Sequence, residues 1–304
     1  MTMRAVLVFN PKATATSARV RDVLARALES QLKLDVVETR RRGHATEIAR
    51  QAARDDIGLV VALGGDGTVN EVVNGIVGTP TELAVVPGGS TNVFARALGL
   101  SANPVDATSE ILDALRSQRR RTVNLGVANG RYFTFCAGVG IDAEVVRVVE
   151  RHRRNGRSAT PALYVRSAVA HFFTGTERRA PSIVMSRPGV PDEEGLFNVI
   201  VANGAPWTYF GEHPVDPCPH ADFDAGLDVL AMRKLGVVST LRVVRQMFDS
   251  KPRIKSKATF QVHDAAEFTV SSDRPLAYQL DGDYLGEIET VTFKSLPDAI
   301  SVVV

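Results

Sequence analysis

The sequence predicts a doubly wound α/β domain with a parallel sheet, followed by a mostly antiparallel β-sandwich domain. Two observations predict the first domain: short apolar strands alternate with helical patterns up to about residue 120, and these strands end in turns rich in Gly, Pro and Asn. Strands that alternate with helices form a parallel sheet covered on both faces. Beyond residue 181, apolar runs of strand length dominate. We expect domains at residues 1–125 and 126–304, and leave open whether the last strand returns to the first domain.

The elements of the first domain alternate regularly. Each predicted strand is a run of apolar residues, and each predicted helix carries apolar residues at helical spacing on one face. The strands are predicted at residues 5–9, 35–38, 57–63 and 83–86, and the helices around residues 20–28, 48–52, 69–76, 93–98 and 111–115.

The pattern changes near residue 122. Strands at Thr122–Ala128 and Tyr132–Ala137 are separated by Asn129-Gly130, a dipeptide typical of a two-residue hairpin. A helix over Asp142–Glu150, a polar basic loop over Arg151–Ser158 and a helix that begins at Thr160-Pro161 are expected next. Further strands are predicted at residues 182–186, 196–203, 227–232, 259–263, 267–271, 276–280, 289–294 and 299–304, with a helix at 239–248.

Composition and charge are those of an ordinary globular protein. Of 304 residues, 44% are hydrophobic and 23% are charged, and the net charge is only +2, so nothing demands a nucleic acid partner. The two cysteines form neither a metal pair nor a disulfide framework. The N-terminus does not resemble a signal peptide, and no run approaches the roughly 18 apolar residues of a membrane span. We expect a cytoplasmic protein.

The stretch Gly64–Glu71 carries the clearest chemical signal. It places three glycines and an Asp between a buried strand and a helix. Glycines let a ligand approach the backbone closely, and the N–H groups at the start of a helix suit phosphate oxygens. The alternative is structural, since Thr68 and Glu71 fit a capping box. The stretch is neither a Walker A loop nor a dinucleotide fingerprint, which argues against a Rossmann dehydrogenase.

Polar loops follow all four predicted strands of the first domain. They are Asn10-Pro11-Lys12, Thr39, Gly64–Glu71 and Pro87–Asn92. Because the carboxyl ends of parallel strands meet at one edge of a sheet, these loops are expected to converge on a ligand. Their donors and acceptors suit a nucleotide and its phosphates.

These motifs resemble the diacylglycerol kinase catalytic domain family, which includes bacterial lipid kinases and sphingosine kinases and is distantly related to NAD kinases. Gly64–Glu71 matches its hallmark, and Asn10-Pro11, Gly43–Ala45 and Pro87–Arg96 match its other motifs in order. Asp281–Asp283 resembles its late Asp-Gly-Glu. The resemblance covers residues 5 to about 290. It implies an ATP- and Mg²⁺-dependent kinase that transfers the γ-phosphoryl group to a lipid hydroxyl, with diacylglycerol as the leading acceptor.

The resemblance also implies roles for single residues. Asp66 would position Mg-ATP or the acceptor hydroxyl, and Asp283 stands where the family has a Glu that is proposed to accept the proton. Asp142 would hold the acceptor hydroxyl, with a helix N-cap as the alternative. The acceptor is expected to enter at a cleft between the domains. The implied nucleotide-binding positions are Asn10, Lys12, Thr39, Gly64, Gly65, Asp66, Gly67, Thr68, Val69, Asn70, Glu71, Gly89 and Ser90.

A structural Mg²⁺ site is implied in the second domain. There the Asp224 carboxylate would be joined by main-chain oxygens of Ala221 and Gly226, which are the hard ligands that Mg²⁺ prefers. The alternative for Asp224 is a turn-forming residue before a strand.

Three departures from the family pattern keep other functions open. Lys12-Ala13-Thr14 replaces Ser-Gly, Val93 replaces an Asp, and Asp283 is one methylene shorter than Glu. A catalytically weak nucleotide- or lipid-binding protein is therefore one alternative, and a kinase of a soluble hydroxyl compound, as in NAD kinases, is another. Basic clusters at 147–157 and 251–257 either contact an anionic membrane surface or form a solvated face. An exposed edge strand would allow a homodimer.

Overall fold

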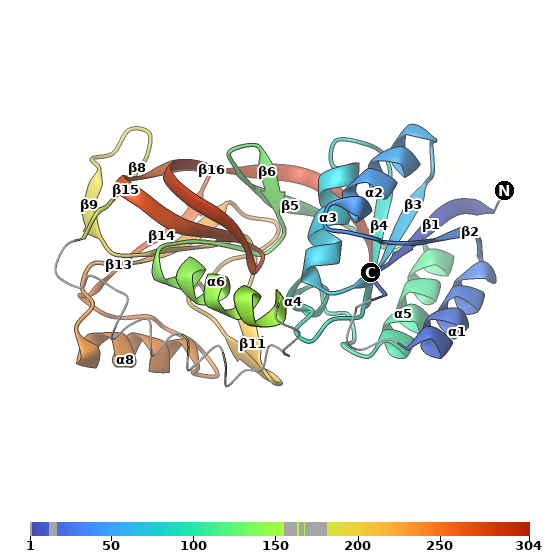
Figure 1. Cartoon of the computed structure of the whole chain (residues 1–304), viewed down its shortest axis with the longest axis horizontal. Coiled ribbons are helices and arrows are strands. Elements are labelled where there is room, and N and C mark those ends of the chain that lie inside the picture. The colour runs from blue at the N-terminus through green and yellow to red at the C-terminus, as the bar shows by residue number, and fades with distance from the viewer. Residues whose placement is uncertain (1, 12–16, 155–162, 164–166, 168–180) are drawn as a thin grey trace. The chain divides into compact units, whose positions relative to one another are not determined.

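The computed structural model describes residues 2–11, 17–154, 163, 167 and 181–304. It divides into two compact units. Unit 1 comprises residues 1–125 together with 297–304, and unit 2 comprises residues 126–296. Figure 1 shows the helices and strands of both units. Within the described residues, no helix is both long and apolar enough to cross a membrane.

Unit 1 is built on a parallel sheet in the order β4-β3-β1-β2. The C-terminal residues extend this sheet, because Val302 of β16 pairs in parallel with Leu83 of β4. The strands of unit 1 are β1 (Met3–Phe9), β2 (Leu32–Glu38), β3 (Leu59–Gly64) and β4 (Glu82–Pro87), and its helices are α1 (Ala18–Glu29), α2 (His44–Arg54), α3 (Asp66–Ile76), α4 (Val93–Ala97) and α5 (Pro104–Ser117).

Helices cover both faces of this sheet, with α2 and α3 on one face and α1 and α5 on the other (Figure 1). The helices bury small and branched side chains against the central strands, such as β3, in which every residue is buried. Helices α2 and α3 approach closely at Gly75, where an added Cβ would lie 2.6 Å from Ala49 Cβ. The predicted α/β fold with helices on both faces is confirmed.

Unit 2 contains an antiparallel sheet in the order β14-β13-β10-β7-β15-β16. Strand β8 also pairs with β15, and β9 pairs with β8. Its core stacks Phe268 on Phe293, with ring centroids 5.2 Å apart, and Phe133 meets Phe293 edge-on at 6.2 Å. The predicted β-rich second domain is confirmed. Its strands are β6 (Arg131–Phe133), β7 (Cys136–Val139), β8 (Ile183–Ser186), β9 (Glu193–Leu196), β10 (Val199–Ala202), β11 (Thr208–Phe210), β12 (His213–Val215), β13 (Leu227–Met232), β14 (Thr259–Ala265), β15 (Glu267–Leu280) and β16 (Asp283–Val303), and its helices are α6 (Ile141–Arg154) and α8 (Val237–Met247).

The predicted hairpin at Asn129-Gly130 is present. Strand β5 (Arg120–Ala128) pairs with β6 so that Ala128 faces Arg131, which leaves a two-residue loop. Both loop residues have positive φ, +46° at Asn129 and +84° at Gly130, as a type I′ turn requires.

Three local predictions are wrong. The single strand expected at Tyr132–Ala137 is split into β6 and β7, because residues 134–136 donate to a buried carboxylate instead of continuing one ladder. The loop expected from Arg151 is helical as far as Arg154, since α6 continues. The two short strands expected at 267–271 and 276–280 form one long strand, β15, and the two expected at 289–294 and 299–304 belong to a second long strand, β16. The helix expected at Thr160-Pro161 lies outside the described residues apart from 163 and 167.

Candidate nucleotide and acceptor sites

The polar loops of unit 1 meet at one edge of its sheet. The parallel register places Phe9 of β1 beside Glu38 of β2 and Leu63 of β3, and Gly64 beside Pro87 of β4. The four predicted strand-end loops therefore begin side by side. The strand order reverses direction between β1 and β3, which is where open α/β sheets bind ligands.

Two of these loops touch through their backbones. The first is the glycine loop, residues 64–67, and the second follows β4. A Cβ at Gly89 would lie 2.6 Å from Gly65 Cα, and a Cβ at Gly65 would lie 3.2 Å from Gly89 Cα. Gly88 N also donates to Gly64 O at 2.8 Å. A side chain at Gly89 would therefore push the two loops apart, and one at Gly65 would make a tight contact.

Helix α3 begins directly in the glycine loop. Its N-cap is Gly65, which has extended backbone angles and makes no side-chain capping hydrogen bond. The first N–H groups of a helix have no intrahelical acceptor, so this end of α3 suits an anion. Thr68 is buried and packs on Gly64, where an added Cβ would lie 2.6 Å from Thr68 Oγ1.

Asp66 links the glycine loop to α4. Its Oδ1 accepts a hydrogen bond of 3.2 Å from Phe94 N in the first turn of that helix. The loop before α4 is closed by Asn92, whose amide accepts from Gly89 N and donates to Gly89 O, both at 2.9 Å. Asn92 has φ of +49°. Asp66 is only partly buried, so its carboxylate borders the same edge of the sheet as the glycines.

The capping box that was the structural alternative for Thr68 and Glu71 is not formed. Helix α3 begins two residues before Thr68, and the Glu71 carboxylate turns to a different helix. Its two oxygens accept from Gly43 N at 2.7 Å and Ala45 N at 3.0 Å, at the start of α2. Glu71 therefore ties α3 to α2.

The other predicted nucleotide-binding residues lie around this edge. Ser90 is exposed, and Thr39 and Gly67 are partly exposed. Thr39 N donates to Phe9 O at 2.9 Å, which fixes the start of its loop. Val69 and Asn70 belong to α3, and their side chains are buried, at 2% exposure each. Lys12 lies outside the described residues.

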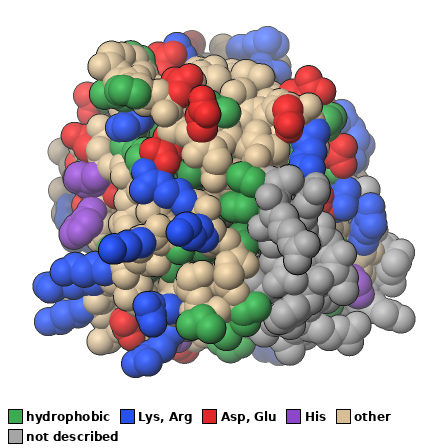
Figure 2. Space-filling model, turned by 90° about the vertical axis from the view of Figure 1, so that its left-hand side faces the viewer, with side chains coloured by type: hydrophobic (Ala, Val, Ile, Leu, Met, Phe, Trp, Pro, Cys, Tyr) green, Lys and Arg blue, Asp and Glu red, His purple; other side chains and the backbone are tan. Residues whose placement is uncertain are grey.

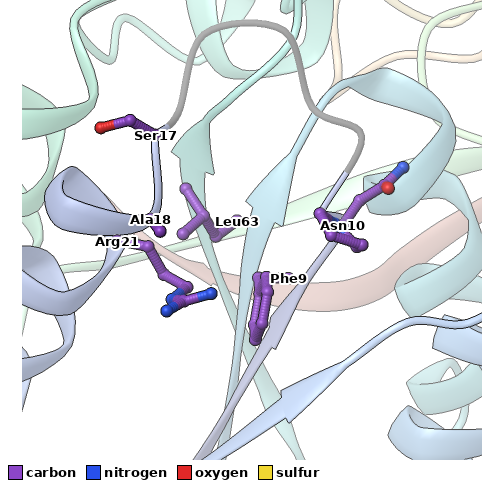
Figure 3. Close-up of a pocket in the computed structure, with 7 residues that line it drawn as sticks. Phe9, Asn10, Ser17, Ala18, Arg21 and Leu63 are labelled. Carbon is purple, nitrogen blue, oxygen red and sulfur yellow. The ribbon is translucent and has the colours of Figure 1, made fainter.

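A cavity of about 140 Å³ opens at the carboxyl end of β1. Its lining includes Phe9, Leu63 and Arg21, and the Arg21 guanidinium lies 4.7 Å from the centre of the Phe9 ring. Asn10 also lines it, but its side chain is directed away from Arg21 and Ser17 (Figure 3). This volume is below the roughly 300–1,000 Å³ of typical small-molecule pockets.

In unit 2, a tight turn follows β15. The aspartate turn, residues 280–283, joins paired residues Leu280 and Asp283 through Asp281 and Gly282, whose φ values are +49° and +77°. This is again the type I′ geometry for which Asp-Gly is suited. Asp281 is buried, and its two carboxylate oxygens accept from Thr134 N (2.7 Å), Thr134 Oγ1 (2.8 Å), Phe135 N (3.0 Å) and Cys136 N (3.1 Å).

Further hydrogen bonds fix the aspartate turn around Asp283. Gly282 N donates to Gln279 Oε1 at 2.9 Å, and Tyr284 N donates to Glu150 Oε1 of α6 at 3.2 Å. Asp283 itself is partly exposed. The residue proposed as proton acceptor thus sits on a backbone held at both sides. Burial raises the pKa of Asp281 above its ordinary value, while the backbone donors act in the opposite direction.

Asp142 is connected to the same turn. It lies in the first turn of α6, after the helix start at Ile141, so the N-cap alternative is wrong. Its Oδ2 accepts from Gln279 Nε2 at 2.7 Å, and a Cβ at Gly138 would overlap that oxygen. Burial raises the pKa of Asp142 to about 6, with the Gln279 hydrogen bond acting against it.

The loop predicted to bind Mg²⁺ precedes β13. Asp224 is exposed, and its N–H donates to Asp222 Oδ1 at 3.0 Å, so Asp222 is the residue that forms the turn. Gly226 N donates to Asp264 Oδ1 at 2.6 Å. Among the described residues, no three acidic, His or Cys side chains gather as metal ligands. A cation at Asp224 would therefore depend on main-chain oxygens such as those of Ala221 and Gly226.

Sequence reasoning missed Gln279 and Glu150. Both hold the aspartate turn, yet neither belongs to a recognisable motif. Gln279 is 1% exposed between two apolar neighbours in β15, and only its burial distinguishes it. No pattern in the sequence could have identified Gln279.

Comparison with known proteins shows the family of the chain. The sequence model described as the diacylglycerol kinase catalytic domain matches residues 4–128, and the one described as the YegS C-terminal NAD kinase beta sandwich-like domain matches residues 136–304. The two matches together cover nearly the whole chain, which belongs to the family of diacylglycerol kinases and YegS-like lipid kinases. A probable lipid kinase, YegS-like, from Chromohalobacter salexigens is 36% identical over 288 residues, which are 91% of this chain and 86% of that protein.

Other relatives match less completely. The diacylglycerol kinase of Bacillus subtilis is 37% identical over 146 residues, and the match covers 45% of this chain and 46% of that protein. The alignment thus spans less than half the length of this relative. A crystal structure of a putative diacylglycerol kinase from Bacillus anthracis has a TM-score of 0.77 at 21% identity and covers 99% of this chain and 96% of that one. At this identity the likeness shows the fold alone.

Proposed function

We propose that the chain is a lipid kinase that transfers the γ-phosphoryl group of Mg-ATP to a lipid hydroxyl, with diacylglycerol as the leading acceptor. The observation that carries the proposal is the backbone contact between Gly65 and Gly89 at the carboxyl edge of the parallel sheet. The absence of side chains there lets polyphosphate approach the start of α3, whose first N–H groups have no intrahelical acceptor. Membership of the family and the names of its relatives support the same reaction.

In this reaction the acceptor oxygen attacks the γ-phosphorus, the bond to the ADP oxygen breaks, and the hydroxyl proton goes to a base. Such transfers depend on positioning and on neutralising charge, so the protein needs little covalent chemistry. The residues of the glycine loop bind the phosphates, and Asp66 orients Mg-ATP or the acceptor. Mg²⁺ would supply charge neutralisation on the phosphate oxygens.

Unit 2 supplies the acceptor side in this proposal. Asp283 accepts the proton, and its fixed backbone compensates for a side chain shorter than Glu. Asp142, joined to the aspartate turn through Gln279, helps to hold the acceptor. Asp224 with the main-chain oxygens of Ala221 and Gly226 holds a structural cation.

The test is incubation with γ-labelled ATP, Mg²⁺ and a mixed lipid extract, followed by identification of the labelled lipid. We expect a labelled phospholipid product, and label in an added soluble acceptor such as NAD would instead support the NAD-kinase-like alternative. Nucleotide binding without labelling of any acceptor would support a binding protein.

Two substitutions test the residues. Asp66→Ala should abolish labelling, and Asp66→Asn, which keeps an acceptor for Phe94 N, isolates the loss of charge. Asp56→Asn is the matched control, since Asp56 is exposed and Asn tolerates its φ of +52°.

Asp283→Ala should lower turnover by about 10²- to 10⁴-fold, as loss of a general base does, with nucleotide affinity retained. Near-normal turnover would remove Asp283 from the mechanism.

A further inference from the structure

The outer face of α8 exposes apolar side chains. Val238 is 73% exposed and Leu241 is 63% exposed, whereas Val243 and Met247 on the opposite face are buried in the core of unit 2. At 100° per residue, the exposed residues share one side of the helix. They are Val237, Val238, Leu241 and Val244.

The hairpin of β11 and β12 adds an aromatic ring next to the end of α8. Phe210 is 42% exposed, and its ring lies 6.2 Å from that of Phe248 in an edge-on contact. His213 stacks on the same Phe248 ring and its Nε2 lies 2.7 Å from Phe248 O. The hairpin is therefore fixed to the helix. We call Val237, Val238, Leu241, Val244 and Phe210 the α8 surface.

Positive charge is concentrated on α8 and in the segment that follows it. Residues 234–257 contain seven Lys and Arg residues and one acidic residue, Asp249, although the whole chain carries only +2. Within the described residues, the Lys and Arg side chains of residues 237–257 form no ion pair. Figure 2 shows Lys and Arg side chains gathered near apolar ones at the lower edge of this side of unit 2. All seven are exposed: Lys234, Arg242, Arg245, Lys251, Arg253, Lys255 and Lys257.

We propose that the α8 surface docks onto an anionic lipid bilayer, with α8 lying in the plane of the headgroups. A helix with an apolar face flanked by Lys and Arg binds membranes in this way, because the apolar side chains enter the headgroup boundary while the cations contact anionic lipids. The inference rests on the proposed function only in that a lipid acceptor resides in a bilayer. Membrane docking itself requires no turnover.

Charge favours a bilayer over a second copy of the chain. In a two-fold contact the same patch faces itself, so the basic residues of one copy, Arg242 and Arg245 among them, would face the basic residues of the other. Like charges placed opposite each other oppose association. An anionic bilayer satisfies both the apolar stripe and the basic residues.

The experiment is co-sedimentation of the full chain with vesicles, without ATP. We expect binding to phosphatidylcholine vesicles that contain phosphatidylglycerol and little binding to phosphatidylcholine alone. Val238→Asp with Leu241→Asp should lower the bound fraction on the order of tenfold, because two anionic side chains replace two inserted apolar ones. The matched control is Val23→Asp with Val105→Asp, two valines of unit 1 that are 57% and 53% exposed. It adds the same charge and should retain binding.

A second pair tests the cations. Arg242→Gln with Arg245→Gln should weaken binding to the anionic vesicles severalfold, and Arg50→Gln with Arg54→Gln, exposed on α2, should not. Equal binding by wild type and both α8 variants would overturn the proposal. So would a change from dimer to monomer in Val238→Asp with Leu241→Asp at unaltered vesicle binding. Transfer of label to a short-chain, water-soluble diacylglycerol tests the proposed function separately, and the α8 variants should retain it.

Discussion

The glycine loop of unit 1 and the aspartate turn of unit 2 are organised by opposite means. At the glycine loop, side chains are missing where the backbones of two loops meet at Gly65 and Gly89. At the aspartate turn, the buried side chain of Asp281 gathers four donors from residues 134–136. The first arrangement lets a ligand approach the backbone at the start of α3, and the second uses main-chain groups to fix the turn that carries Asp283. Substitutions should therefore damage the first by adding atoms and the second by removing them.

The largest effect is expected from Asp281→Ala. It leaves buried donors of Thr134, Phe135 and Cys136 without their acceptor, and each such donor costs about 1–3 kcal/mol. The free energy of unfolding should fall by on the order of 3 kcal/mol or more, measured by urea denaturation. Asp281→Asn keeps one acceptor oxygen and tolerates the positive φ, so its loss should be intermediate. Asp283→Asn should leave the stability nearly unchanged. If Asp281→Ala were as stable as Asp283→Asn, the carboxylate would not organise the turn.

A smaller effect is expected from Gly89→Ala. The new methyl group would lie 2.6 Å from Gly65 Cα, so the two loops must separate. Overpacking of this kind costs about 1–3 kcal/mol, and ATP affinity measured by titration calorimetry should fall with it. Gly58→Ala is the control, because the closest contact of its methyl group would be the flexible Met3 side chain, at 3.3 Å. Unchanged ATP affinity in Gly89→Ala would show that contact between the loops does not shape the nucleotide site.

The two regions also differ in how far the sequence could predict them. Unit 1 follows from local signals: apolar strands and helical periodicity predict β1 to β4 and the helices on both faces, and Gly64–Glu71 predicts the turn between β3 and α3. The hairpin at Asn129-Gly130 is equally local, since two residues determine the turn. The position of these loops at one edge then follows from the parallel sheet itself.

Long-range hydrogen bonds could not be predicted in this way. The break between β6 and β7 depends on Asp281, which is 147 residues from Thr134 along the chain. Glu71 matches a capping pattern within its own helix, yet its carboxylate binds Gly43 N, 28 residues earlier. Gln279 alternates with apolar neighbours in the manner of any strand residue, and only the folded structure places it between Asp142 and Gly282. Such contacts arise when distant segments meet, so no local pattern encodes them.

The smallest effect is expected from Asp142→Asn, and it depends on pH. Burial raises the pKa of Asp142 in the folded state to about 6, above its ordinary value of 3.8. The folded protein therefore binds this proton more tightly than the unfolded chain, and its stability falls as pH rises from about 4 to about 6. Asn does not titrate and still accepts from Gln279 Nε2. Each pKa unit corresponds to about 1.4 kcal/mol, and part of the burial cost remains with the amide, so we expect a gain of about 1–2 kcal/mol above pH 6 and little below pH 4.

Urea denaturation of both proteins between about pH 4 and pH 8 measures this difference. Burial also raises the pKa of Asp216 to about 6, but that residue is present in both proteins, so the difference between them isolates Asp142. A constant difference across this range would mean that Asp142 does not titrate there. If the variant is more stable near neutral pH and also has a higher KM for the lipid acceptor, the buried charge is retained for the acceptor at the expense of stability. That result would extend the contrast between the two regions, because a carboxylate of unit 2 would then serve the ligand and not the fold.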